Sequence, residues 1–470
     1  MRDRRVPIVS IHQQSPRTHL KPTLPPSVRR VVDDWRTFAT PSHRPYHGIA
    51  TGQAFAAALA SEAIVVPLLL VLGAPPWVVA AVATLPTLGS AVQRFVPALL
   101  RRTDGNLRAL TLLAVGLGET RGLVLATVVA LVALGWLAPV AGILAIILVI
   151  SVGQTLGLVS GANLLVWYNA ILPDGERRLV GPRVAALTLA ISTVLLLPAA
   201  VAVDLVPQAH VLWAYAVLLA AGGVAGFLTL ASASRLRSPG RVHVAPDRTA
   251  EAAEPNDFAR FRRVAVISAF GFGVMPYTSI YVMSVLGMSA GFAIGLSAIG
   301  SAASLVAAAG VGTVLTRASS SRILRSSFVA RGLAALLFIA AFPGNPIAPL
   351  LVTIAVATHW AGSASGSLAQ NERLFRLLIG RPVVALQGRY VAQIALASSG
   401  GQLATSAVLA IAGPYGYLAF APTYAVSGLA RLVAARRTET SPSWSSQTGI
   451  WQIGPGGSIA PMVEAVPADA

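Results

Sequence analysis

Long apolar runs constrain this chain of 470 residues more than any other feature of its sequence. They recur along most of its length, and each is long enough to cross roughly 30 Å of bilayer hydrocarbon as a helix. Hydrophobic residues make up 55% of the chain, whereas charged residues make up only 11%. The sequence therefore predicts an all-α polytopic membrane protein.

We predict twelve transmembrane helices, six in each of two bundles. Their ranges are 50–72, 76–100, 108–136, 139–170, 183–204, 210–232, 264–286, 290–315, 322–342, 347–370, 386–411 and 415–433. A polar run at 233–263 separates the two groups and carries seven arginines among proline, alanine and acidic residues. That composition is typical of a solvated linker. The predicted domains are an N-terminal bundle at 49–232, this cytoplasmic linker, and a C-terminal bundle at 264–435.

The two tails are predicted to differ. Residues 1–48 form a basic cytoplasmic tail, in which Ser27 can cap a short helix over 27–39 whose apolar residues share one face. Such a helix would lie on the inner leaflet of the membrane; a chance pattern in an unstructured tail is the alternative. Residues 436–470 show no charge run and no periodicity, so we expect a disordered cytoplasmic tail.

The positive charge of the chain follows its predicted topology. The net charge is +18, and 34 of the 35 Lys and Arg residues fall on the even-numbered connections, the linker or the tails. We assign only Arg121 to the interior of a span, and the odd-numbered connections hold none. Lys and Arg are enriched in cytoplasmic loops. We therefore expect an inner-membrane protein with both termini in the cytoplasm, and no nucleic-acid partner.

An internal repeat appears when the chain is shifted by 214 residues. The VLG triplet at 71–73 then meets the VLG triplet at 285–287, and Arg108 meets Arg322. In both copies a span ends in this triplet, a second span returns, and a short basic loop follows. A parallel duplication of six spans is one of the architectures known for transporters.

The repeat leads to a family resemblance. Segment 281–324 closely resembles the seventh and eighth helices, with their cytoplasmic loop, of the major facilitator superfamily. Residues 71–110 resemble the matching region of the first half, and 167–183 resembles the family's basic loop between helices four and five. The resemblance covers about 50–435 and rests on layout more than on signature residues. It implies a secondary transporter of twelve helices.

The cytoplasmic loops contain a candidate inner gate. The family's loop motif places an acidic residue before its arginine, but here the acid of the first copy is displaced and the second copy has none. We still expect the charged loop residues to contact helix ends and to hold the inner gate shut. These residues are Arg101, Arg102, Asp104, Arg108, Arg177, Arg178, Arg317 and Arg322.

Ionisable residues inside the membrane are costly, so each is a functional candidate. Glu62 lies about 13 residues into the first span, near its middle depth. A carboxyl there could exchange protons near neutral pH and couple transport to a proton gradient. The alternative is a glutamate that a neighbouring helix satisfies and that only fixes packing.

Glu119 and Arg121 form a second candidate in the third span. Residues two apart point about 200° apart on a helix, so they cannot pair along one face. Either the helix is broken near Gly118 and Gly122, or Arg121 pairs with another carboxylate, such as that of Glu62. We favour a structural ion pair over a site for an anionic substrate.

Further candidates for the central cavity are neutral. Span ten contains His359 and Trp360, and span seven contains Tyr277 and Tyr281, one turn apart. The histidine and the tyrosines could equally serve packing and hydrogen bonding.

The fourth span adds Gln154 and Asn163, which we predict to face the lumen. Gly153, Gly157 and Gly161 on the same span are spaced for close helix packing.

The chain shows no Walker loop, no HExxH motif and no GxSxG elbow, and it has no cysteine. We therefore predict a transporter rather than an enzyme, without cofactor or metal, working as a monomer in the lipid bilayer on a small-molecule substrate and protons. Proton-coupled export of a small organic molecule is the preferred hypothesis. A sugar or metabolite uptake permease, or a non-transporting or enzymatic membrane protein on the same fold, is the alternative.

Overall fold

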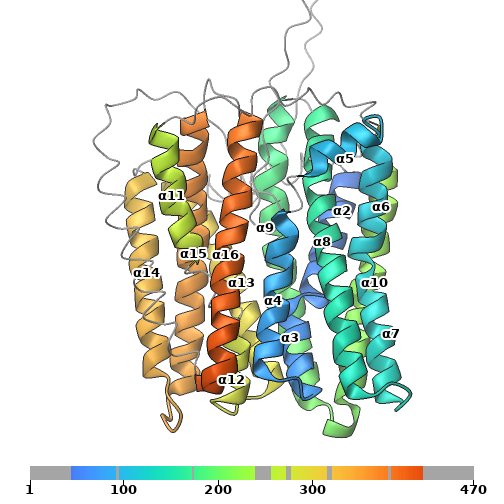
Figure 1. The fold of residues 1–470 in the computed structure, drawn as a ribbon, viewed down its shortest axis with the longest axis vertical. Helices are drawn as coiled ribbons and strands as arrows, with labels where there is room; N and C mark the ends of the chain where they lie inside the picture. The colour runs from blue at the N-terminus through green and yellow to red at the C-terminus, as the bar shows by residue number, and fades with distance from the viewer. Residues whose placement is uncertain are drawn as a thin grey trace, which may run out of the picture. The chain divides into compact units, whose positions relative to one another are not determined.

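The computed structural model describes residues 44–91, 95–171, 174–238, 256–270, 277–314, 320–378 and 383–415. All regular structure in these ranges is helical (Figure 1). The helices are α2 (Arg44–Leu59), α3 (Glu62–Val71), α4 (Pro76–Ala91), α5 (Val96–Arg102), α6 (Leu107–Glu119), α7 (Arg121–Ala133), α8 (Pro139–Ile171), α9 (Asp174–Leu205), α10 (Val211–Ser234), α11 (Asn256–Phe270), α12 (Thr278–Ser284), α13 (Ala290–Val314), α14 (Ser320–Ala340), α15 (Ala348–Leu378) and α16 (Val383–Ala412). Short 3-10 turns occupy Gln208–His210 and Gly413–Tyr415.

Every predicted span except the last overlaps one of these helices or two successive ones, although 92–94 in the second span and 271–276 in the seventh lie outside the described residues. By length and composition, eight helical stretches of the described chain could cross a membrane. The predicted all-α membrane fold is therefore confirmed. The count of twelve stays a prediction, because almost all of 415–433 lies outside the described residues.

Three further predictions concern segments that lie wholly or mostly outside the described residues. They are the amphipathic helix at 27–39, the tail at 436–470 and most of the linker at 233–263. The described ends of the linker are helical in part, since α10 extends to Ser234 and α11 begins at Asn256. The predicted domain boundaries remain predictions.

Exposed apolar side chains cover the outer faces of the helices. Val140, Leu144 and Leu148 recur every four residues along α8 and are 63–69% exposed. Leu113 on α6 and Val217 on α10 are exposed to a similar degree, 61% and 66%. A soluble monomer rarely exposes apolar patches of this extent, so these faces are suited to lipid.

The repeated triplets have the same conformation. Gly73 and Gly287 both adopt a positive φ, 81° and 65°, in the turns that follow α3 and α12. Glycine is favoured there because it has no Cβ to clash in the left-handed region. After each turn a long helix begins, α4 at Pro76 and α13 at Ala290, which are separated by the predicted offset of 214.

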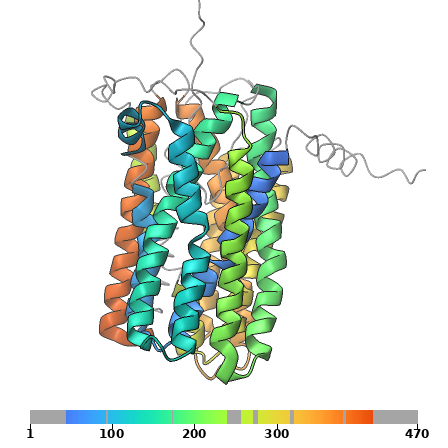
Figure 2. The same ribbon diagram turned by 90° about the vertical axis from the view of Figure 1, so that its right-hand side faces the viewer.

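The two halves of the sequence meet along two helix pairs. Helix α9 packs against α13, and α4 packs against α16 (Figures 1 and 2). The apolar core is shared, since it contains Leu68 and Ile146 from the first half and Ile280 and Val352 from the second. Within the halves, α7 packs on α10 and α14 on α15.

One assignment of charge was wrong. We placed Arg331 among the basic residues of a cytoplasmic connection, but it lies inside α14 and is only 3% exposed. Arg121 is therefore not the one arginine within the membrane helices. The pattern of charge along the sequence could not separate this buried arginine from Arg322 and Arg325, about two turns before it.

Candidate functional site

The first span is interrupted at the depth of Glu62. Helix α2 ends at Leu59, and Ser61 adopts an extended conformation (φ −109°, ψ 178°) before α3 begins at Glu62. The Ser61 hydroxyl accepts a hydrogen bond from Ala63 N at 3.2 Å. This is the N-cap arrangement, which satisfies one of the free amides at the start of a helix. The sequence analysis did not predict this break.

The third span is also interrupted, between α6 and α7. Thr120 separates the two helices and donates a hydrogen bond from its hydroxyl to Gly116 O. The break lets Glu119 and Arg121 approach, with 3.9 Å between the guanidinium Nη1 and the carboxylate Oε2. Of the two alternatives for Arg121, the broken helix is therefore correct. The pairing with Glu62 does not occur, because Arg121 forms its described ion pair with Glu119.

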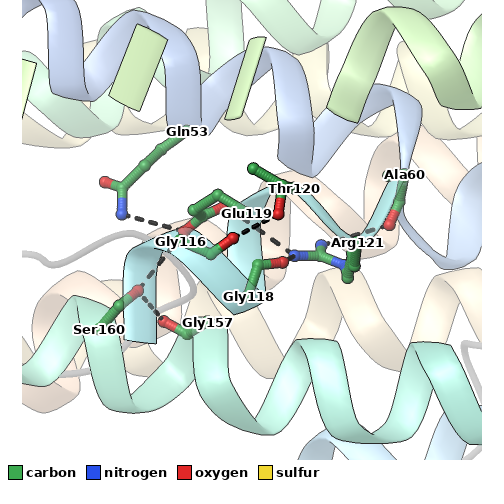
Figure 3. Close-up of polar contacts among 9 residues, drawn as sticks. All are labelled: Gln53, Ala60, Gly116, Gly118, Glu119, Thr120, Arg121, Gly157 and Ser160. Carbon is green, nitrogen blue, oxygen red and sulfur yellow. Dashed lines mark hydrogen bonds and ion pairs between the residues drawn. The ribbon is translucent and has the colours of Figure 1, made fainter. Parts of the chain in front are cut away.

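Figure 3 shows that the pair is the centre of a polar cluster drawn from four helices. The Glu119 carboxylate accepts hydrogen bonds from Gln53 Nε2 on α2 at 3.2 Å and from Ser160 Oγ on α8 at 3.5 Å. Arg121 donates to Gly118 O at 2.6 Å and to Ala60 O at 3.2 Å. Glu119 and Arg121 are 6% and 7% exposed. We call these two residues with Gln53 and Ser160 the Glu119 cluster.

The glycines of α8 make room for this arginine. A Cβ on Gly153 would lie 2.4 Å from Cδ of Arg121, and one on Gly157 would lie 3.7 Å from its Nη1. A Cβ on Gly161 would meet no atom of the described residues within 4 Å. Gly153 and Gly157 thus serve close packing in part by accommodating a charged side chain, whereas Gly161 does not.

Glu62 has a different environment. It is partly buried, and within the described part of the chain its carboxylate forms no hydrogen bond and no ion pair. Helix α3, which begins at Glu62, packs against α12 and α13 of the second half. Glu62 therefore lies where the first span faces the second half of the chain.

The two tyrosines hold helices together. Tyr277 OH donates to Gln402 O on α16 at 3.0 Å, and Tyr281 OH donates to Ala341 O after α14 at 2.8 Å. Thr84 on α4 and Ser406 on α16 lie within hydrogen-bonding reach of the Tyr277 hydroxyl. Both phenol rings are fully buried. Their hydroxyls therefore point to different partners, and Tyr277 links residues of both halves.

A second polar cluster joins α14 to α15. Ser363 Oγ lies 3.2 Å from Nε2 of His359 and accepts a hydrogen bond from Arg331 at 3.3 Å. His359 is 2% exposed, whereas Trp360 beside it is 44% exposed. Their rings meet edge to face with centroids 5.9 Å apart. The histidine was predicted from the sequence, but its contact with Ser363 and the bond from Arg331 to that serine were not.

The lumen-facing candidates on α8 remain candidates. Asn163 is completely buried, and neither polar atom of its amide has a hydrogen-bond partner in the described part of the chain. The same holds for the side-chain oxygen of Gln154. Buried amides are nearly always satisfied, so these two side chains offer unused hydrogen-bonding capacity inside the first half.

The predicted gate residues are only partly described. Arg108 donates to Ser234 O, the last residue of α10, at 2.8 Å, so it contacts a helix end of its own half. Arg101, Arg102, Asp104 and Arg322 are exposed. Arg317 and the side chains of Arg177 and Arg178 lie outside the described parts. The gating role stays a prediction.

One polar contact between the halves was not predicted. Asp204, near the end of α9, accepts hydrogen bonds from Ser289 Oγ at 2.7 Å and from Gly291 N at 2.9 Å. Ser289 Oγ in turn accepts from Phe292 N at 3.0 Å. Asp204 thus joins the first half to the first turn of α13. Only its place as the last residue of the fifth predicted span could have drawn attention to it.

No family model matches this sequence, and no curated protein matches it. Solved structures do match. The xylose transporter XylE from E. coli, in a partially occluded inward open conformation, superposes with a TM-score of 0.61 over 83% of this chain and 98% of its own, at 10% identity. The chain has the major facilitator fold. The fold that the sequence resemblance implied is thereby confirmed, apart from the number of helices.

Two other structures show the same likeness. A bacterial homologue of the iron transporter ferroportin, in its inward-facing state, gives a TM-score of 0.59 at 15% identity and covers 85% of this chain and 99% of its own. The nucleoside transporter NupG gives 0.56 at 12% identity and covers 85% and 98%. XylE is a xylose transporter, NupG is a nucleoside transporter, and the third protein is a homologue of an iron transporter. Their substrates differ, so the major facilitator fold leaves the substrate of this chain open.

Proposed function

We propose that this chain is a secondary active transporter that moves a small organic molecule across the inner membrane by alternating access. The observation that carries the proposal is the Glu119 cluster, together with Glu62, inside a helical membrane fold. A charged pair in hydrocarbon is expensive, and such residues generally mark substrate or ion pathways. Two interrupted spans meet at this depth, as in many transporters whose sites form at discontinuous helices.

Proton coupling is the finer part of the proposal. The preferred coupling group is Glu62, because its carboxylate has no bond in the described chain that a proton would have to break. Glu119 is the rival, and its contacts favour a structural ion pair. Export of an amphipathic compound is the preferred direction, since the interior is mostly apolar with scattered polar groups. A sugar or metabolite uptake permease is the second candidate, and a non-transporting or enzymatic protein on this fold is the third.

The proposal places both termini and the linker in the cytoplasm, and the protein as a monomer in the bilayer. It assigns the protein no cofactor and no metal. Of the His, Cys, Asp and Glu residues in the described ranges, no three lie together in a group that could hold a metal ion.

The test is a screen of an over-expressing strain and of a matched strain without the gene against metabolites and drugs. Proton-coupled export predicts lower cellular accumulation of at least one compound, and a protonophore should remove the difference. A difference that survives the protonophore would contradict proton coupling. Higher accumulation, again abolished by the protonophore, would favour the uptake permease instead.

A further inference from the structure

The break in the first span leaves a backbone acceptor without its helical donor. In a continuous helix Ala60 O would accept from Ile64 N four residues later. Here Ile64 N donates to Ser61 O at 3.1 Å instead. Ala60 O at the end of α2 therefore needs another donor, because an unsatisfied carbonyl is costly inside a membrane.

The guanidinium of Arg121 supplies that donor and closes a second helix end at the same time. Its Nη2 donates to Ala60 O, while its Nη1 donates to Gly118 O in the last turn of α6 (Figure 3). The last carbonyls of a helix have no partner within the helix. A guanidinium can serve two of them because its donors form a rigid planar fork. A lysine ammonium has no such fork.

The Glu119 cluster fixes the position of Arg121 relative to α2. Glu119 lies beside the guanidinium and also accepts a hydrogen bond from Gln53. Gln53 and Ala60 are seven residues apart, so they lie on one face of α2 about two turns from each other. Helix α2 is thus attached to the third span at two points, and the second is the last residue before the bend at Ser61.

We propose that Arg121 is a positioning residue that fixes the angle between α2 and α3 and thereby places Glu62. The inference rests on the proposed function, since it assigns Glu62 the coupling role. Glu62 is the first residue of α3 and lies two residues after the carbonyl that Arg121 binds. A change in the Arg121 contacts therefore alters the bend at the residue that directly precedes Glu62.

The test measures the bend directly and needs no substrate. The chain has no native cysteine, so nitroxide labels can be attached at Ala57→Cys and Val71→Cys, one on each side of the break. Both positions are exposed. In a straight helix their Cα atoms would be about 21 Å apart, a separation that double electron–electron resonance can resolve. The label distance is recorded in lipid for the doubly labelled parent and for each variant.

Arg121→Lys and Arg121→Gln should shift and broaden the distance distribution relative to the parent. Gly153→Ala should act in the same direction with every charge retained, because its methyl group would displace the Arg121 side chain. Gly161→Ala is the matched control on the same helix and should leave the distribution unchanged, since its methyl group meets no atom. If the arginine variants do not fold, Gly153→Ala decides.

A distance distribution in Arg121→Lys that equals that of the parent would overturn the proposal, because the site would then require a positive charge but not the planar guanidinium. An unchanged distribution in Arg121→Gln or Gly153→Ala would overturn it as well, as would an equal change in Gly161→Ala. The coupling role proposed for Glu62 has a separate test. A Glu62→Gln variant that still accumulates substrate against a gradient would remove that role and leave the measured distances as they are.

Discussion

At the scale of single residues, Glu62 and Glu119 differ in what their carboxylates contact. Glu119 accepts hydrogen bonds from Gln53 and Ser160 and lies beside Arg121. Its negative charge is therefore compensated within the protein. Glu62 has no such contact in the described chain, and α3, which it begins, packs against α12 of the other half. A proton can join or leave Glu62 without breaking a described contact, which suits the coupling role proposed for it.

Glu62→Gln should abolish proton-driven accumulation while sparing downhill exchange. Glutamine keeps the shape and hydrogen bonding of the side chain but cannot release a proton. The measurement is flux of the substrate found by the screen, in reconstituted vesicles with and without an imposed proton gradient. Full active transport by this variant, with loss only in Glu119→Gln, would move the coupling role to the third span.

Glu119→Gln should mainly reduce folded protein. Removing the charge of Glu119 leaves the buried charge of Arg121 uncompensated. Complete loss of one member of a buried ion pair typically destabilises the folded state by about 3–5 kcal/mol. We expect a lower yield in the membrane and a lower apparent melting temperature in detergent than for Glu62→Gln. Equal stability of the two variants would argue that the ion pair contributes little to the fold.

At the scale of elements, the positions of the spans along the sequence could be predicted, but the contacts between their side chains could not. A long apolar run is readable from composition, and the Ser61–Glu62 sequence even contains a helix start signal. The break at Thr120 was foreseen only as one of two alternatives. Gln53, Ser160 and Arg331 were missed, because a polar residue in a span reveals its partner only once the rotation of each helix is known.

The inner loops provide the prediction at this scale. Arg108 binds the last carbonyl of α10, where a positive charge also interacts favourably with the helix dipole. Reversing its charge together with that of its repeat counterpart, as Arg108→Glu with Arg322→Glu, should lower transport and leave membrane insertion intact. Transport assays and membrane yield of the double variant test this. Normal transport by the double variant would show that these two arginines serve only to set the topology.

At the scale of the whole molecule, orientation rests on the distribution of arginine. Reporter fusions at Pro75, Gly344 and Gly413 should report the outside of the membrane, because the connections that contain them carry no Lys or Arg. Fusions at Asp104 and Ala245 should report the cytoplasm. A single clear reversal would contradict the twelve-span topology.

The contact between Asp204 and α13 joins the two halves, so its place in the predicted topology bears on how the halves can move. Asp204 bonds Ser289 and Gly291 across the two halves, at the end of α9 that the predicted orientation places outside. A carboxylate at the first turn of a helix is also favoured by the helix dipole. In alternating access the halves rock against each other around a central site. The outer ends joined here must therefore part for the outward-open state to form.

Linking Asp204→Cys to Ser289→Cys with a short bis-methanethiosulfonate, which joins the two thiols through disulfide bonds, should stop transport. The chain has no other cysteine, so the reagent can join only these two positions within one molecule. Transport by the linked protein is compared with that of the same protein after the link is cleaved by a reductant, which should restore the original rate. Each single-cysteine variant treated with the same reagent is the control for labelling alone. Transport that continues at the original rate in the linked protein would show that α9 and α13 need not separate there, and would contradict the rocking movement.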